Sequence, residues 1–122
     1  MDLQTLQRFE IRELIYFVVL AEELHLGRAA ERVGIQESPL SRAISTMERK
    51  LGVRLFVRTR KGTRTSATGD ALLPIARQML ADAEHAHQVL HAAASGRQGR
   101  LRIAFCENVA SPQNRCADED VA

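Results

Sequence analysis

The chain has 122 residues, 45% of them hydrophobic, which is enough for one compact domain with a real core. Its longest apolar run, LIYFVVLA at 14–21, is too short to span a bilayer, and the N-terminus lacks the apolar core of a signal peptide. Two cysteines are too few for a disulfide framework. We therefore expect a cytoplasmic protein without a membrane partner. The net charge of +2 is unevenly distributed: residues 38–66 hold eight Lys/Arg and one Glu, a +7 typical of polyanion-binding surfaces, although a solvated basic surface without a partner has the same composition.

The first half of the chain predicts two helices in succession. Residues 11–24, IRELIYFVVLAEEL, carry a wide apolar stripe at helical spacing. A shorter helix is expected over 27–33, with Ala29 and Ala30 on its apolar face. Gly34 follows where a helix can end in the left-handed region, which glycine adopts without a Cβ clash.

A third helix is expected to open within QESP at 36–39, where Ser38 and Pro39 suit the N-cap and the first turn. It ends at Gly52, and its apolar positions are spaced 4, 3 and 4: Leu40, Ile44, Met47 and Leu51.

Two short helices around a tight glycine turn, the second of them basic, predict a helix-turn-helix. The outer face of the third helix is then free to enter a major groove, where Arg42 can reach a guanine edge or a phosphate. An ordinary helical hairpin is the alternative. The outward positions at the start of this helix are Glu37, Ser38, Ser41, Arg42 and Ser45.

The segment VRLFVRTRKGTRTS predicts a two-stranded wing beside the third helix. Val53, Leu55 and Val57 alternate as in a strand, RKGT offers a turn, and 63–66 can pair back. The wing tip, RTRKGTRT, puts four cations into eight residues, which suits the phosphates that flank a major groove. A solubilising turn is the alternative.

A long helix is expected from Ser66, or from Thr68 as the alternative cap, to Ser95–Gly96, with Pro74 kinking it or marking where its regular ladder starts. One of its faces carries an unbroken heptad seam rich in alanine, which predicts pairing with a second copy. The alternative is that the seam packs back on its own domain. The seam residues are Leu72, Ala76, Met79, Ala83, Ala86, Leu90 and Ala93.

The chain resembles the N-terminal region of LysR-type transcriptional regulators over roughly residues 9–105. The resemblance rests on AA at 29–30, PLSR at 39–42, LGVRLFVRT at 51–59 and Gly69 followed by ALL. It implies a mainly α fold, a winged helix-turn-helix followed by a linker helix that forms a homodimer, and double-stranded DNA as the partner. The DNA-facing positions that it implies are Glu37, Ser38, Ser41, Arg42, Arg58, Arg60 and Lys61.

The resemblance also implies a domain order and shows two departures. We expect a DNA-binding domain at 1–66, a dimerisation helix at 67–95, and at 96–122 a first strand (GRLRIAF) of a missing effector domain plus a disordered tail. No small-molecule effector is therefore expected for this chain. The missing effector domain has three possible explanations: the chain is a fragment, a change of reading frame produced its tail, or the protein is naturally short. The other departure is Glu37, where the family usually has glutamine, which points to an altered sequence preference.

Two rival classes of function are weaker. For an enzyme, His87 and His91 have the i, i+4 spacing of metal ligands, but no third ligand, catalytic pair or phosphate loop accompanies them, so we expect no catalytic residue, metal or cofactor. The other is a dimerising stub that binds full-length regulators through the helix seam without productive DNA binding of its own.

Overall fold

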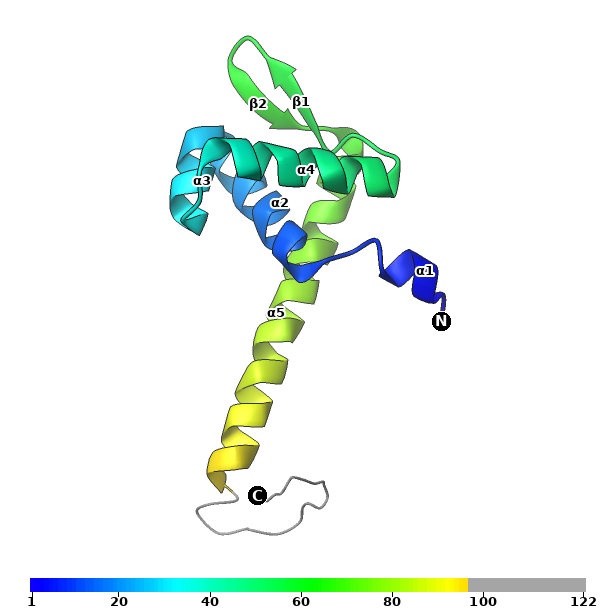
Figure 1. Ribbon diagram of the computed structural model, residues 1–122, viewed down its shortest axis with the longest axis vertical. Coiled ribbons are helices and arrows are strands. Elements are labelled where there is room, and N and C mark those ends of the chain that lie inside the picture. Colours follow the sequence, from blue (N-terminus) through cyan, green and yellow to red (C-terminus); the bar gives the residue numbers. More distant parts are fainter. Residues whose placement is uncertain (97–122) are drawn as a thin grey trace. The chain divides into compact units, whose positions relative to one another are not determined.

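The computed structural model describes residues 1–96, and its elements confirm the mainly α fold with a two-stranded wing and a long helix (Figure 1). The predicted strand GRLRIAF and the tail with Cys106 and Cys116 lie outside the described residues. The elements are α1 (Leu3–Leu6), α2 (Ile11–Glu23), α3 (Leu26–Val33), α4 (Glu37–Leu51), β1 (Phe56–Thr59), β2 (Gly62–Thr65) and α5 (Ala67–Gly96). The short helix α1 was not predicted; Asp2 caps it by accepting the backbone N–H of Gln4.

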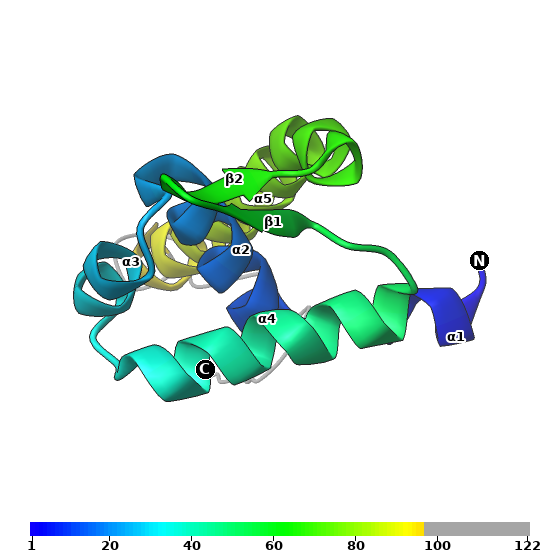
Figure 2. The same cartoon turned by 90° about the horizontal axis from the view of Figure 1, so that it is seen from above.

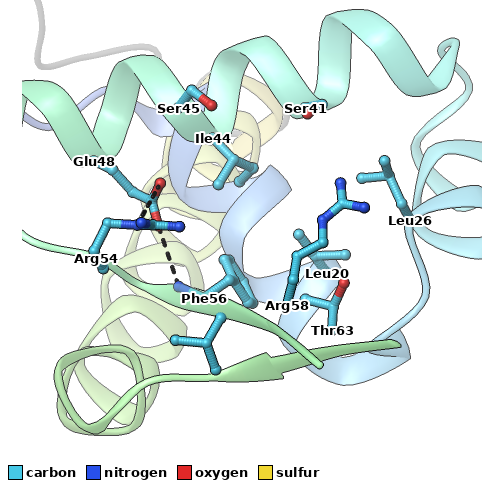
Figure 3. Close-up of a pocket in the computed structure, with 11 residues that line it drawn as sticks. Leu20, Leu26, Ser41, Ile44, Ser45, Glu48, Arg54, Phe56, Arg58 and Thr63 are labelled. Carbon is cyan, nitrogen blue, oxygen red and sulfur yellow. Dashed lines mark hydrogen bonds and ion pairs between the residues drawn. The ribbon is translucent and has the colours of Figure 1, made fainter. Parts of the chain in front are cut away.

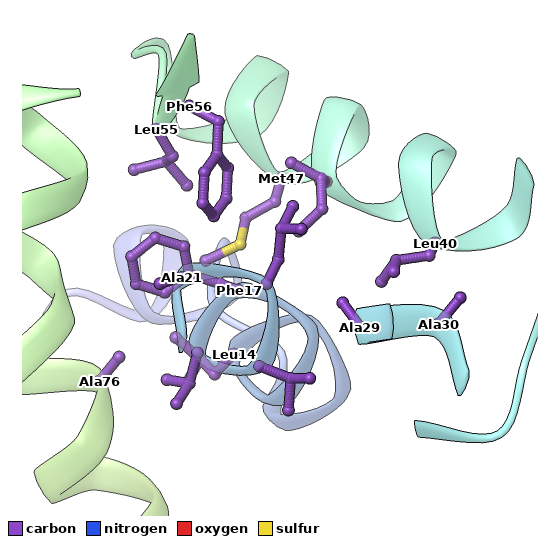
Figure 4. Packing of buried hydrophobic residues seen from close by; sticks show 14 residues of the cluster. Leu14, Phe17, Ala21, Ala29, Ala30, Leu40, Met47, Leu55, Phe56 and Ala76 are labelled. Carbon is purple, nitrogen blue, oxygen red and sulfur yellow. The ribbon is translucent and has the colours of Figure 1, made fainter. Parts of the chain in front are cut away.

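Helix α2 lies at the centre of the core, as its wide apolar stripe predicts (Figure 4). Phe17 has no exposed surface, and its ring lies 5.5 Å from that of Phe56, which brings the start of the wing onto α2. Ala29 and Ala30 are buried where α3 packs against the neighbouring helices, so their small size allows the close crossing of a helix-turn-helix.

The ends of α3 and α4 follow the glycine signals. Gly34 and Gly52 have φ of 80° and 72°, the left-handed conformation expected at helix C-caps. Helix α4 opens within QESP, as expected, but Ser38 is not its cap: the N-cap is Gln36, which makes no side-chain capping bond. Pro39 still lies in the first turn, where its missing N–H costs nothing.

The wing is an antiparallel hairpin in which Phe56 pairs with Thr65 and Thr59 with Gly62. The predicted alternation is wrong, because Val53 and Val57 are exposed while Leu55 and Phe56 are both buried. Leu55 precedes the strand, and within β1 Phe56 is buried while the three residues that follow it are all exposed.

Helix α5 begins as expected after Ser66, whose hydroxyl accepts the backbone N–H of Gly69 at 3.0 Å. The first turn crosses very close to the chain that enters the wing. A Cβ at Gly69 would lie 2.3 Å from the carbonyl oxygen of Leu55, so only glycine fits there. Pro74 lies inside α5 and does not mark the start of its ladder.

The chain divides into two packed units, Met1–Ala81 and a second that begins at Asp82. The start of α5 therefore belongs to the first unit. The described part of the second unit, 82–96, continues α5 with every side chain exposed. None of the helices described has both the length and the apolar character needed to cross a membrane.

Candidate nucleic-acid interface

Helix α4 has one buried face and one face open to solvent. Leu40 and Met47 have no exposed surface and Ile44 is 6% exposed, which fixes α4 on the core. The opposite positions carry short polar or charged side chains, all exposed except for the half-buried Ser41: Glu37, Ser38, Ser41, Arg42 and Ser45. This is the face that the sequence predicted for a major groove.

The wing lies beside this face of α4 (Figure 2). A cleft of about 110 Å³ separates the two, with Ile44 and Phe56 in its lining. Figure 3 shows Ser41 and Ser45 along one wall and the guanidinium of Arg58 extending from β1 towards α4. Arg60 and Lys61 form the exposed turn of the hairpin, so the predicted groove-reading and wing residues lie on adjoining surfaces.

Three of the eight cations in 38–66 have partners within the protein. Lys50 forms ion pairs with Glu13 at 2.8 Å and with Glu10 at 3.4 Å, and the hydrogen bond to Glu13 raises the pKa of Lys50 above its ordinary value of 10.5. Arg49 donates to the hydroxyl of Thr46 at 3.3 Å. The third, Arg54, lies 3.6 Å from a carboxylate of α4.

The other five cations keep their charge available to an external partner. Within residues 1–96, none of their side chains takes part in a hydrogen bond or an ion pair. They are Arg42, Arg58, Arg60, Lys61 and Arg64, all exposed and all on α4 or the wing.

Sequence reasoning missed the role of Glu48, the one acid of this basic segment. Its Oε2 accepts the backbone N–H of Leu55 at 2.7 Å and that of Phe56 at 3.2 Å, and its Oε1 faces Arg54 (Figure 3). The available signal was an isolated acid within a strongly basic stretch, which favours an internal partner over solvent.

Glu37 is placed differently from the other outward residues of α4. Its Oε2 lies 3.1 Å from the point that a Cβ on Gly27 would occupy, and the imidazole Cε1 of His25 is equally close to that point. His25 caps α3, because its Nδ1 accepts the backbone N–H of Arg28 at 3.1 Å. The carboxylate of Glu37 therefore lies over the first turn of α3.

The predicted dimerisation seam divides into two parts. Ala76 has no exposed surface, and Leu72 and Met79 pack against the core of the first unit, so these three residues are occupied within their own domain. The later positions Ala83, Ala86, Leu90 and Ala93 are exposed.

The histidines of α5 do not assemble a metal centre in the described residues. The rings of His87 and His91 lie 6.4 Å apart and nearly parallel, as their i, i+4 spacing predicts. Across residues 1–96 no group of three or more potential metal ligands comes together.

Residues 11–70 match the family of bacterial regulatory helix-turn-helix proteins of the lysR type. The solved DNA complex of the CbnR DNA-binding domain is 35% identical in sequence, superposes with a TM-score of 0.66, and is matched over 99% of its length by 70% of this chain. The chain belongs to the LysR family.

Other LysR-family proteins match as well. The DNA-binding domain of BenM, solved with catB site 1 DNA, is 31% identical with a TM-score of 0.69, and the match covers 71% of this chain and 98% of that one. The regulator TfdT of Cupriavidus pinatubonensis is 42% identical over 96 residues, which are 79% of this chain and 42% of that protein. YnfL of Escherichia coli is also 42% identical over 96 residues, 32% of its length.

The chain thus spans about a third to two fifths of the length of these curated relatives. All of them are named as HTH-type transcriptional regulators, so the family is one of regulators and not of enzymes. The part that matches the family, residues 11–70, contains α2 to β2 and so includes α4 and the wing, which carry the five exposed cations.

Proposed function

We propose that this chain is a sequence-specific regulator of transcription that binds double-stranded DNA in the bacterial cytoplasm. Helix α4 enters the major groove through Ser38, Ser41 and Arg42, and the wing contacts the flanking phosphates through Arg58, Arg60 and Lys61. One observation carries this proposal: the five cations of 38–66 that form no hydrogen bond or ion pair within residues 1–96 all lie on α4 and the wing. The solved DNA complexes of CbnR and BenM, which have the same fold, support it.

Glu37 has a separate place in this proposal. Because its carboxylate lies over Gly27 and His25, it sits at the edge of the groove-facing surface and not at its centre. An ionised carboxylate accepts hydrogen bonds only, so it favours a cytosine amino group over other base edges. We therefore expect Glu37→Gln to change which bases are preferred at one position and to leave the remaining positions unchanged.

We further propose that the chain acts as a homodimer through the exposed part of α5. Ala83, Ala86 and Leu90 offer an apolar strip on a helix whose other described side chains in 82–96 are also exposed. A symmetric dimer presents two α4 helices to two half-sites, so the bound DNA has dyad symmetry.

The first experiment is a selection from a random duplex library, followed by fluorescence anisotropy on the selected duplex and on a shuffled copy over a range of salt concentrations. Tight binding to the selected duplex, weak binding to the shuffled one and a steep salt dependence are expected. Equal weak binding to both would overturn sequence specificity. Enrichment of no common sequence would do the same.

A charge-reversal variant with Glu at Arg42, Arg58 and Lys61 separates binding from assembly. It is expected to lose DNA binding and to keep the oligomeric state of the parent chain, because none of the three residues lies on α5. Loss of both properties together would contradict the division of labour between the wing domain and α5.

A second candidate is a dimerising stub that pairs with longer regulators of the family and blocks them. The observation in its favour is the exposed apolar strip of α5, in which Leu90 is 69% exposed. Native mass spectrometry of a mixture with such a regulator tests it. A mixture that contains homodimers alone removes this candidate.

A further inference from the structure

Glu48 is a negative charge in the middle of a surface that is otherwise positive. It is the only acid in residues 38–66, and it lines the cleft between α4 and the wing together with Arg54 and Arg58. A carboxylate at this place weakens the attraction for phosphate. The loss of attraction for phosphate must be offset by another contribution of Glu48, and its hydrogen bonds at the base of the wing supply that contribution.

Both oxygens of Glu48 are engaged at the base of the wing. One accepts two successive backbone N–H groups, those of Leu55 and Phe56, at 2.7 and 3.2 Å. The other lies 3.6 Å from the guanidinium Nε of Arg54. With 13% of its side-chain surface exposed, Glu48 makes these bonds largely away from water, which strengthens bonds to a charged acceptor.

These bonds join α4 directly to the first residue of β1. Arg58 follows two residues later on the same strand, and its side chain extends from there towards α4 (Figure 3). The far end of the hairpin lies near the end of α2: a Cβ on Gly62 would lie 3.8 Å from the carbonyl oxygen of Leu24. The bonds of Glu48 therefore join the wing to α4 at its base, while the ring contact of Phe56 with Phe17 joins it to α2.

We propose that Glu48 is a positioning residue for DNA recognition, which holds the wing beside α4 so that Arg58 meets a phosphate next to the bases that α4 contacts. The inference rests on the proposed DNA-binding function and adds to it a role for a residue that touches no DNA. Glu48 acts through the backbone of Leu55 and Phe56, and its negative charge is tolerated for that reason.

Two substitutions of Glu48 and one matched control test the proposal on the full chain. Glu48→Gln removes the charge, and Glu48→Asp keeps the charge but shortens the reach to the two amides. Glu31→Gln is the control, because Glu31 is an exposed acid on α3, so the variant makes the same change in net charge away from the wing. Each is titrated with the selected and the shuffled duplex.

For specific DNA-binding proteins, the affinity for the specific duplex is commonly about a thousand times or more that for a non-specific one. In both Glu48 variants, the ratio of the affinity for the selected duplex to that for the shuffled duplex is expected to fall by about tenfold or more. Glu31→Gln is expected to keep the ratio while binding both duplexes slightly more tightly. If Glu48→Gln merely behaves like Glu31→Gln and Glu48→Asp behaves like the parent, Glu48 acts only by its charge and the proposal is overturned.

A double-mutant cycle with Arg58→Gln gives a readout that a general loss of stability does not move. Arg58→Gln should weaken binding strongly in the parent chain and far less in the Glu48→Asp background, because the displaced wing no longer brings Arg58 to its phosphate. Equal losses in both backgrounds would contradict the proposal. If the parent itself shows no preference for the selected duplex, it is the proposed function that fails, and not the role of Glu48 alone.

Discussion

At the scale of single residues, the basic segment contains two kinds of cation. Lys50 and Arg54 face carboxylates of their own domain, whereas Arg42, Arg58 and the turn cations have no such partner among residues 1–96. Composition predicted the excess of charge but not this division, because pairing depends on which side chains the fold brings within about 4 Å of each other. The same holds for Glu48, whose backbone partners come from a later segment of the chain.

Replacing Arg58 by glutamine should weaken binding to the selected duplex and reduce the slope of log affinity against log salt by about 0.9, the effect of one phosphate contact. Anisotropy titrations over a salt series measure that slope. Arg12→Gln is the control: it removes the same charge from an exposed position on α2, outside α4 and the wing. An unchanged slope in Arg58→Gln would exclude a phosphate contact by this residue.

At the scale of elements, the sequence predicted the helices well and the strands less well. The core face of α4 and the glycines that end α3 and α4 are local signals, so residues 34 and 52 could be assigned without knowledge of the fold. The strand was misplaced because Leu55 is buried by its anchoring to α4, and no two-residue pattern encodes that contact. Four-residue strands are too short for alternation to be decisive.

An ion-pair cluster around Glu22 joins three helices. Glu22 on α2 pairs with Arg32 on α3 at 2.8 Å and with Arg77 on α5 at 3.2 Å. The hydrogen bond from Arg32 lowers the pKa of Glu22 below its ordinary value of 4.5, and that from Arg77 acts in the same direction. Since the pKa is lower in the folded state, the stabilisation is complete above the unfolded value and is lost as the pH falls below 4.5 through the folded pKa.

Glu22→Gln should therefore lower the free energy of unfolding at neutral pH by less than about 1 kcal/mol, because the pairs are largely exposed to solvent. The difference from the parent chain should shrink in acid, where the parent's carboxyl is protonated too. Urea unfolding at neutral pH and at the lowest pH at which the chain stays folded measures both values. A difference that is the same at the two pH values would show that the charge of Glu22 contributes nothing.

At the scale of the whole molecule, the heptad seam of α5 divides into a part that packs in the core and an exposed part, for which we propose a contact with a second chain. Its first three residues complete the core of the first unit, and its later residues are left exposed in 82–96. The sequence shows one continuous pattern because both surfaces require apolar residues at the same spacing. A periodicity cannot tell a core contact from a contact with a second chain, so only the structure could divide it.

Leu90→Lys should weaken the proposed dimer by about tenfold or more, equivalent to about 1.4 kcal/mol, because it places a charge in an apolar seam. Sedimentation equilibrium measures the dissociation constant. Gln88→Lys adds the same charge to an exposed position of α5 off the seam, and it should leave the dimer intact. Equal effects of the two variants would mean that the seam is not where two copies meet.

The contact between Gly69 and the carbonyl of Leu55 has a consequence for how this gene can change. Every single-nucleotide change in a glycine codon that replaces the amino acid introduces a residue with a Cβ. At position 69 each of those residues would bring that atom to 2.3 Å from the oxygen of Leu55 and force the wing and α5 apart. Single-nucleotide changes that replace an exposed residue of α5 can therefore be tolerated, whereas at the codon for Gly69 only synonymous changes are.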